Sequence, residues 1–74
     1  LIMVSVDPSI PTSTVSTAIR KLDTIERIFE VTGEYDIVAV VLSPSIEVVN
    51  QAIEEIRGIG GVVKTNTMII LRTI

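Results

Sequence analysis

Two stretches of the sequence, Leu1–Val6 and Tyr35–Leu42, carry apolar residues at odd-numbered and at even-numbered positions alike. In the first stretch, for example, Val4 and Met3 would face opposite sides of a strand. Because alternate side chains of a β-strand point to opposite faces, both faces of these strands need cover. A sheet with one solvated face would show polar residues at every second position instead. We therefore expect a sheet whose two central strands are buried on both sides.

The chain is too short to provide all of that cover by itself. Isoleucine (13), valine (11) and threonine (8) supply 32 of its 74 residues, and this composition favours strands. Domains are typically about 100–150 residues long, and a smaller one has more surface for its volume. We therefore expect a single domain over residues 1–74 whose sheet packs against a two-fold-related copy of itself.

The remaining periodicity predicts two helices among four strands. The expected strands are Leu1–Val6, Ile25–Thr32, Tyr35–Leu42 and Val62–Thr73, and the expected helices are Thr12–Leu22 and a segment from Ser43–Ser45 to Gly58. Gly33 and Glu34 predict a two-residue type II′ hairpin between the middle strands. The order βαββαβ predicts an α+β, ferredoxin-like fold. In it, a four-stranded antiparallel sheet with spatial order 4-1-3-2 carries both helices on one face.

Charge and composition exclude several classes of function. Six basic and nine acidic residues give a net charge of −3, which argues against direct nucleic-acid binding. The sequence has no histidine or cysteine, so it predicts no metal site, no disulfide, no cofactor and no enzymatic activity. The longest apolar run, Ile37–Leu42, is far short of the ~18–20 residues of a membrane span. Without a signal peptide at the N-terminus, we expect a cytoplasmic protein.

Two segments remain as a candidate binding site. Thr32, Gly33, Glu34, Tyr35 and Asp36 place a hydroxyl, a glycine, a phenol and carboxylates around one hairpin, and Thr65 and Thr67 place two hydroxyls on one strand face. Each segment alone is also explained as an ordinary turn or as a strand-forming sequence. Together they offer a carboxylate for an ammonium group and N–H and O–H donors for a carboxylate, which an α-amino acid requires.

The glycines at positions 58, 60 and 61 do not indicate a phosphate loop. A loop that binds phosphate leads from a strand into a helix N-terminus, whereas these glycines lead from a helix into a strand. They predict a helix end and a tight turn.

Three motifs resemble the effector domain of the Lrp/AsnC transcriptional regulators, called the RAM domain. They are V-T-G-E-Y-D-I at residues 31–37, I-R-G-I-G-G-V at residues 56–62 and T-N-T-M-I-I-L at residues 65–71. The resemblance covers nearly the whole chain, in order and with matching spacing. The V-T-G-x-Y-D element is its most specific part.

The resemblance implies a dimeric α+β barrel, in which two sheets face each other, and assembly of dimers into rings, often octamers. It also implies that amino-acid effectors bind between dimers, near the hairpin that corresponds to Thr32–Asp36. By this analogy Gly33 and Tyr35 line the pocket and Asp36 meets the effector ammonium. Thr65 and Thr67 would come from a neighbouring chain.

Full-length regulators of this kind carry an N-terminal helix-turn-helix, whereas this sequence starts at the first strand. We therefore expect a stand-alone effector module, or one that co-assembles with full-length regulators. The leading hypothesis is a non-enzymatic, oligomeric amino-acid sensor that modulates transcription. The alternative is a purely structural module that assembles with partners and senses no ligand.

Overall fold

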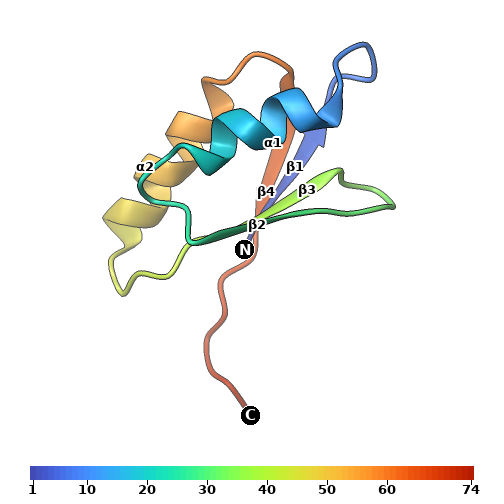
Figure 1. The fold of residues 1–74 in the computed structure, drawn as a ribbon. Coiled ribbons are helices and arrows are strands. Elements are labelled where there is room, and N and C mark those ends of the chain that lie inside the picture. The colour runs from blue at the N-terminus through green and yellow to red at the C-terminus, as the bar shows by residue number, and fades with distance from the viewer.

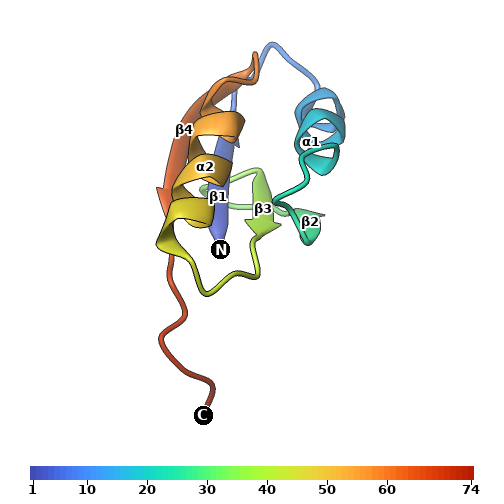
Figure 2. The ribbon, with the colours of Figure 1, turned by 90° about the vertical axis from the view of Figure 1, so that its left-hand side faces the viewer.

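The computed structural model describes every residue from Leu1 to Ile74. Its elements are β1 (Ile2–Val6), α1 (Thr12–Arg20), β2 (Arg27–Glu30), β3 (Ile37–Val40), α2 (Ile46–Arg57) and β4 (Val62–Thr67). The strands form one antiparallel sheet in the order β2-β3-β1-β4, with both helices on the same side of it (Figures 1 and 2). The predicted ferredoxin-like fold and its strand order are therefore confirmed.

The hydrophobic core lies between the helices and the sheet. Its nine buried residues, all apolar, are Ile2, Val4, Val6, Val15, Ile19, Ile37, Ala39, Ala52 and Ile56. The register explains why the strands contribute this set: Ile2 lies opposite Ala39, and Val4 lies opposite Ile37. Paired residues share a face of the sheet. One alternating set of each central strand is therefore buried beneath the helices, as the sequence predicted.

No helix covers the other face of the sheet (Figure 2). A row of side chains crosses all four strands there, because Phe29 pairs with Val38, Val38 with Met3, and Met3 with Asn66. Phe29 is 49% exposed, which is high for a large apolar side chain. We call this the open face. Its cover by a second copy remains a prediction.

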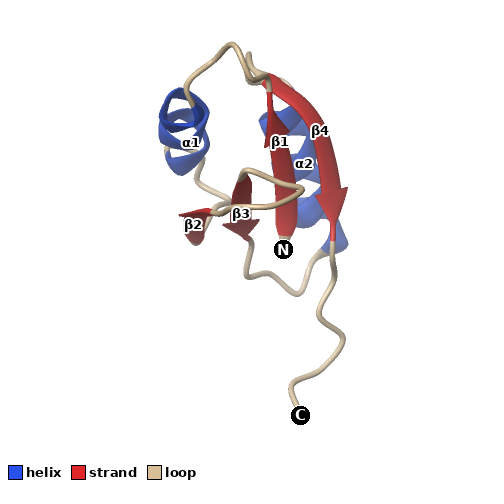
Figure 3. Cartoon of the chain, turned by 90° about the vertical axis from the view of Figure 1, so that its right-hand side faces the viewer, coloured by secondary structure: helices blue, strands red, loops and turns tan.

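The last strand is shorter than predicted. β4 ends at Thr67 rather than at Thr73, although the apolar, strand-forming sequence continues. Leu1 and Met68 still exchange backbone hydrogen bonds, so pairing with β1 continues for one residue past Thr67. Residues 69–74 then run away from the body of the domain as an irregular tail (Figures 1 and 3).

The middle hairpin has the predicted register but a longer loop. β2 and β3 pair up to Glu30 and Ile37, and the Val31 N–H donates to the Asp36 carbonyl at 2.9 Å. Residues 32–35 therefore form a loop of four residues in place of the predicted two. Gly33 has a φ of +118°, a region that residues with a side chain rarely adopt.

Candidate ligand-binding site at the hairpin and the last strand

The β2–β3 loop folds across the open face of β1 and reaches β4 (Figure 3). There the Asn66 amide donates a hydrogen bond to the Tyr35 hydroxyl oxygen at 3.2 Å. The Lys64 ammonium lies 5.7 Å from the centre of the Tyr35 ring, within the range of a cation–π contact. Tyr35 therefore ties the hairpin to the opposite edge strand of the same chain.

Asp36 joins the hairpin to β1. Its Oδ2 accepts a hydrogen bond from the Val6 N–H at 2.8 Å, and its own N–H donates to the Val4 carbonyl at 2.9 Å. The ladder between β1 and β3 ends at Val4 and Ile37, so the Val6 N–H has no partner on β3 and the carboxylate takes that place. Oδ1 accepts no hydrogen bond within the chain. Asp36 therefore has a structural role and one free acceptor.

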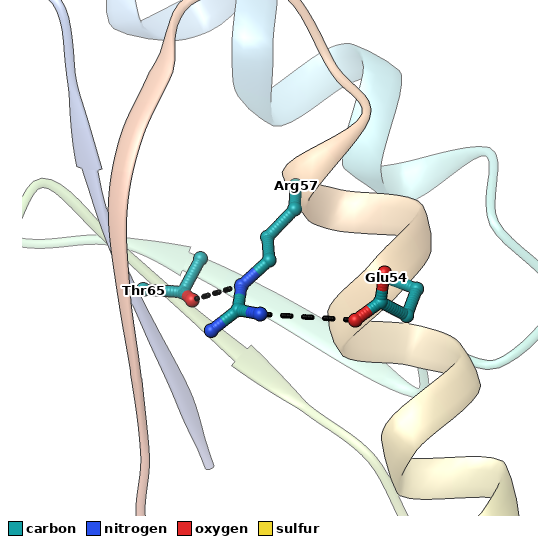
Figure 4. A network of polar contacts seen from close by, with 3 residues as sticks. All are labelled: Glu54, Arg57 and Thr65. Carbon is teal, nitrogen blue, oxygen red and sulfur yellow. Dashed lines mark hydrogen bonds and ion pairs between the residues drawn. The ribbon is translucent and has the colours of Figure 1, made fainter.

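The two threonines lie on the other side of β4. Thr65 pairs with Val4 and Thr67 with Ile2, which are both core residues, so both hydroxyls are on the helix side of the sheet. The Thr65 hydroxyl accepts a hydrogen bond from Arg57 Nε at 3.2 Å (Figure 4). Tyr35 contacts β4 on the open face. A single chain therefore brings the hairpin next to β4 but keeps the threonine hydroxyls on the opposite face.

The cavities do not enclose the hairpin residues. A cavity of about 340 Å³ lies between the C-terminal tail, the start of β1 and α2, and its mostly apolar lining includes Thr67. A second, of about 390 Å³, lies along β4 and is lined by Arg57, Val62, Val63, Lys64 and Thr65. None of the residues 32–36 lines either cavity. Within one chain the candidate residues therefore form two separate groups and no closed pocket. We call these groups, the hairpin residues 32–36 and the two threonines of β4, the half-sites.

The sequence reasoning missed three residues at these half-sites. Asn66 and Lys64 hold Tyr35, and Arg57 holds Thr65. A signal for the first two was available, since they alternate with the threonines and so face the open side of the strand. The position of Arg57 depends on how α2 docks beside β4, which the sequence pattern does not fix.

Other polar groups near the sheet are engaged in structural contacts. Glu30 accepts a hydrogen bond from Ser16 at 2.7 Å, and Glu55 accepts one from Thr24 at 3.2 Å. In the turn after β1, the backbone N–H and the hydroxyl of Ser9 hydrogen-bond the Asp7 carboxylate and hold its pKa below the usual value. No group of three or more acidic residues is placed to hold a metal ion. None of the helices has both the length and the apolar character that crossing a membrane requires.

Comparison with solved structures supports the fold. The protein TTHA0845 from Thermus thermophilus superposes with a TM-score of 0.88, over 99% of this chain and 91% of that one. The two sequences are 24% identical, so the likeness concerns the fold alone.

Comparison with known sequences gives the family. The chain is 47% identical over 73 residues to the HTH-type transcriptional regulator LysM of Saccharolobus solfataricus, and 42% identical over 72 residues to LysM of Sulfurisphaera tokodaii. These matches cover 99% and 97% of the chain, which spans about half the length (51%) of each regulator. A homocitrate synthase of Sulfolobus acidocaldarius matches at 35% identity, over 97% of the chain but 15% of the enzyme.

The family match extends over the whole described chain. Residues 1–74 match the family described as the Lrp/AsnC ligand binding domain. The family is defined by ligand binding, and the regulators match this chain at higher identity than the homocitrate synthase does. From this match, and in agreement with the fold, the chain belongs to the Lrp/AsnC ligand-binding domain family.

Proposed function

We propose that this protein is a non-enzymatic, oligomeric module that binds an amino acid between dimers and thereby modulates the transcription of genes for amino-acid metabolism. The observation that carries the proposal is the match of all 74 residues to a ligand-binding domain that makes up about half of two transcriptional regulators. As a cytoplasmic module it would act alone or in mixed assemblies with full-length regulators of this family.

The chemistry of the half-sites supports an α-amino acid as the effector. The free Oδ1 of Asp36 is an acceptor for an ammonium group, and the backbone of the Gly33 turn supplies N–H donors. The hydroxyls of Thr65 and Thr67 supply donors for the effector carboxylate. Because these hydroxyls lie on the helix side of β4, we propose that they come from a neighbouring chain in the complete site. The residues proposed to bind the effector are Thr32, Gly33, Glu34, Tyr35, Asp36, Thr65 and Thr67.

The open face supports assembly. Met3, Val38 and Phe29 form an apolar row across it, and Phe29 is 49% exposed. Exposed apolar surface of this kind is typical of interfaces. We propose that two copies pack sheet against sheet as a dimeric α+β barrel, and that four such dimers form an octameric ring.

The matches in two kinds of protein support a separable sensing role. A segment of about this length forms 51% of a regulator and 15% of an enzyme. A ligand-binding module explains its presence beside both a DNA-binding and a catalytic unit, whereas a DNA-reading role explains only the first.

One observation favours the alternative, a structural assembly module that senses no ligand. Three of the residues proposed to bind the effector already make contacts inside the chain: Tyr35 with Asn66, Asp36 with Val6 and Thr65 with Arg57. If these contacts are their whole role, the module forms rings without any dependence on amino acids.

Thermal melting with each of the twenty standard amino acids separates the two functions. A ligand at 100 times its Kd stabilises the folded state by about 2.7 kcal/mol, which corresponds to roughly 10–20 °C for a domain of this size. The sensor predicts such a shift with at least one amino acid, at fixed protein concentration. No shift with any of them, in a sample that light scattering shows to be a ring, contradicts sensing and supports the structural role.

A further inference from the structure

Arg57, the last residue of α2, extends from the helix toward β4 (Figure 4). Its Nε–H donates to the Thr65 hydroxyl at 3.2 Å, and its Nη1 lies 3.7 Å from the Glu54 carboxylate. A guanidinium has five N–H donors, and in this chain only the one on Nε makes a hydrogen bond. The side chain is 60% exposed, so its remaining donors are accessible.

The surroundings of Arg57 are suited to an anion. The cavity of about 390 Å³ along β4 is lined by Arg57 and Thr65, and no acidic residue lines it. Lys64 also lines it, but its ammonium lies over the Tyr35 ring on the open face. The edge of β4 adds a backbone donor. Met68 is hydrogen-bonded to Leu1, so the alternation of an antiparallel ladder turns the Thr65 N–H outward, away from β1.

A guanidinium presents parallel N–H donors that bind both oxygens of a carboxylate, and a neighbouring hydroxyl adds a further donor. We infer that Arg57 is the carboxylate-binding residue of the effector site, held in position by Thr65. This inference rests on the proposed function and deepens it. Thr65 accepts the Nε–H of Arg57 and keeps its own hydroxyl proton for the same carboxylate.

The competing explanation is that Arg57 only stabilises the end of its helix. A cation in the last helical turn is favourable by itself, and an exposed ion pair such as Arg57–Glu54 contributes little. α1 offers a matched control, because Arg20 is likewise the last residue of its helix, is exposed and has no hydroxyl partner.

The test uses two panels of probes, the twenty standard L-amino acids and their α-carboxamides, which lack the carboxylate charge. Calorimetry measures the Kd values of the wild type, Arg57→Gln, Arg57→Lys and Arg20→Gln. For the amino acid that the wild type binds, Arg57→Gln should raise the Kd by about 10- to 100-fold, as expected for loss of a charged hydrogen-bonding partner. The Kd of Arg57→Lys should lie between those of the wild type and Arg57→Gln, and the Kd of Arg20→Gln should equal that of the wild type.

The carboxamides separate a direct contact from a structural effect. Arg57→Gln should bind the carboxamide as weakly as the wild type does, because the interaction it removes is absent from that complex. An unchanged Kd for the amino acid in Arg57→Gln, or an equal loss for both probes, would overturn the role of Arg57 and leave the proposed function standing. A wild type that binds no amino acid would overturn both.

Discussion

Replacing Asp36 separates its structural role from its role in binding. Asp36→Ala removes the carboxylate that accepts the hydrogen bond of the Val6 N–H, and Val6 is only 7% exposed. An unpaired, partly buried donor costs about 1–3 kcal/mol, and the half-exposed position of Asp36 favours the lower part of that range. Asp36→Asn keeps a carbonyl oxygen for the same hydrogen bond but removes the negative charge. We expect its stability to lie within about 0.5 kcal/mol of the wild type.

The assay pairs thermal unfolding with amino-acid binding, at one protein concentration because assembly changes apparent stability. In a domain of this size the expected loss for Asp36→Ala is a fall in Tm of roughly 4–15 °C. Asp36→Asn should melt like the wild type and yet bind amino acids about 10-fold or more weakly, since the ammonium group loses its charged partner. An Asp36→Ala variant as stable as the wild type would refute the Val6 contact. Unchanged binding by Asp36→Asn would refute the ammonium site.

Two further predictions concern the turns at the other end of the sheet. Gly61→Ala should destabilise by about 2–4 kcal/mol in urea unfolding, because its φ is +101° and a Cβ would lie 2.9 Å from Val15 Cγ2. Gly60→Ala, with nothing within 4 Å of its Cβ, should change stability by less than about 1 kcal/mol, and equal effects would contradict the packing described. The hydrogen bonds from Ser9 lower the pKa of Asp7 in the folded state, so they stabilise the protein above the ordinary carboxyl pKa of about 3.9 and lose this effect as the pH falls through the lowered value. Asp7→Asn should therefore flatten the fall of Tm between about pH 5 and pH 2, and an unchanged slope would count against it.

The fold could be predicted from the sequence because alternation and spacing determine which side chains face the core. The two faces of Leu1–Val6 and Tyr35–Leu42 identified the central strands, and the glycine at position 33 marked the turn that joins the middle two strands. The end of β4 could not be predicted from its own sequence. Strand-forming residues continue past Thr67, but whether they pair depends on contacts with other segments, which a local pattern does not describe.

The candidate site was predicted only in part, for a related reason. Family motifs and residue chemistry pointed to the hairpin and to the strand with Thr65. The contacts that hold them join residues about 30 positions apart, such as Asp36 with Val6 and Tyr35 with Asn66. Local patterns carry no information about such pairs, because they depend on how the loop folds over the sheet.

The central claim is that the effector site is complete only where several copies of this chain meet. Native mass spectrometry of the protein with the twenty amino acids tests it most directly, since it counts chains and bound ligands in the same ion. The account predicts that an amino acid is found on complexes of several copies and never on single chains. An amino acid bound to the single chain, or oligomers that carry none at saturating concentrations, would contradict it.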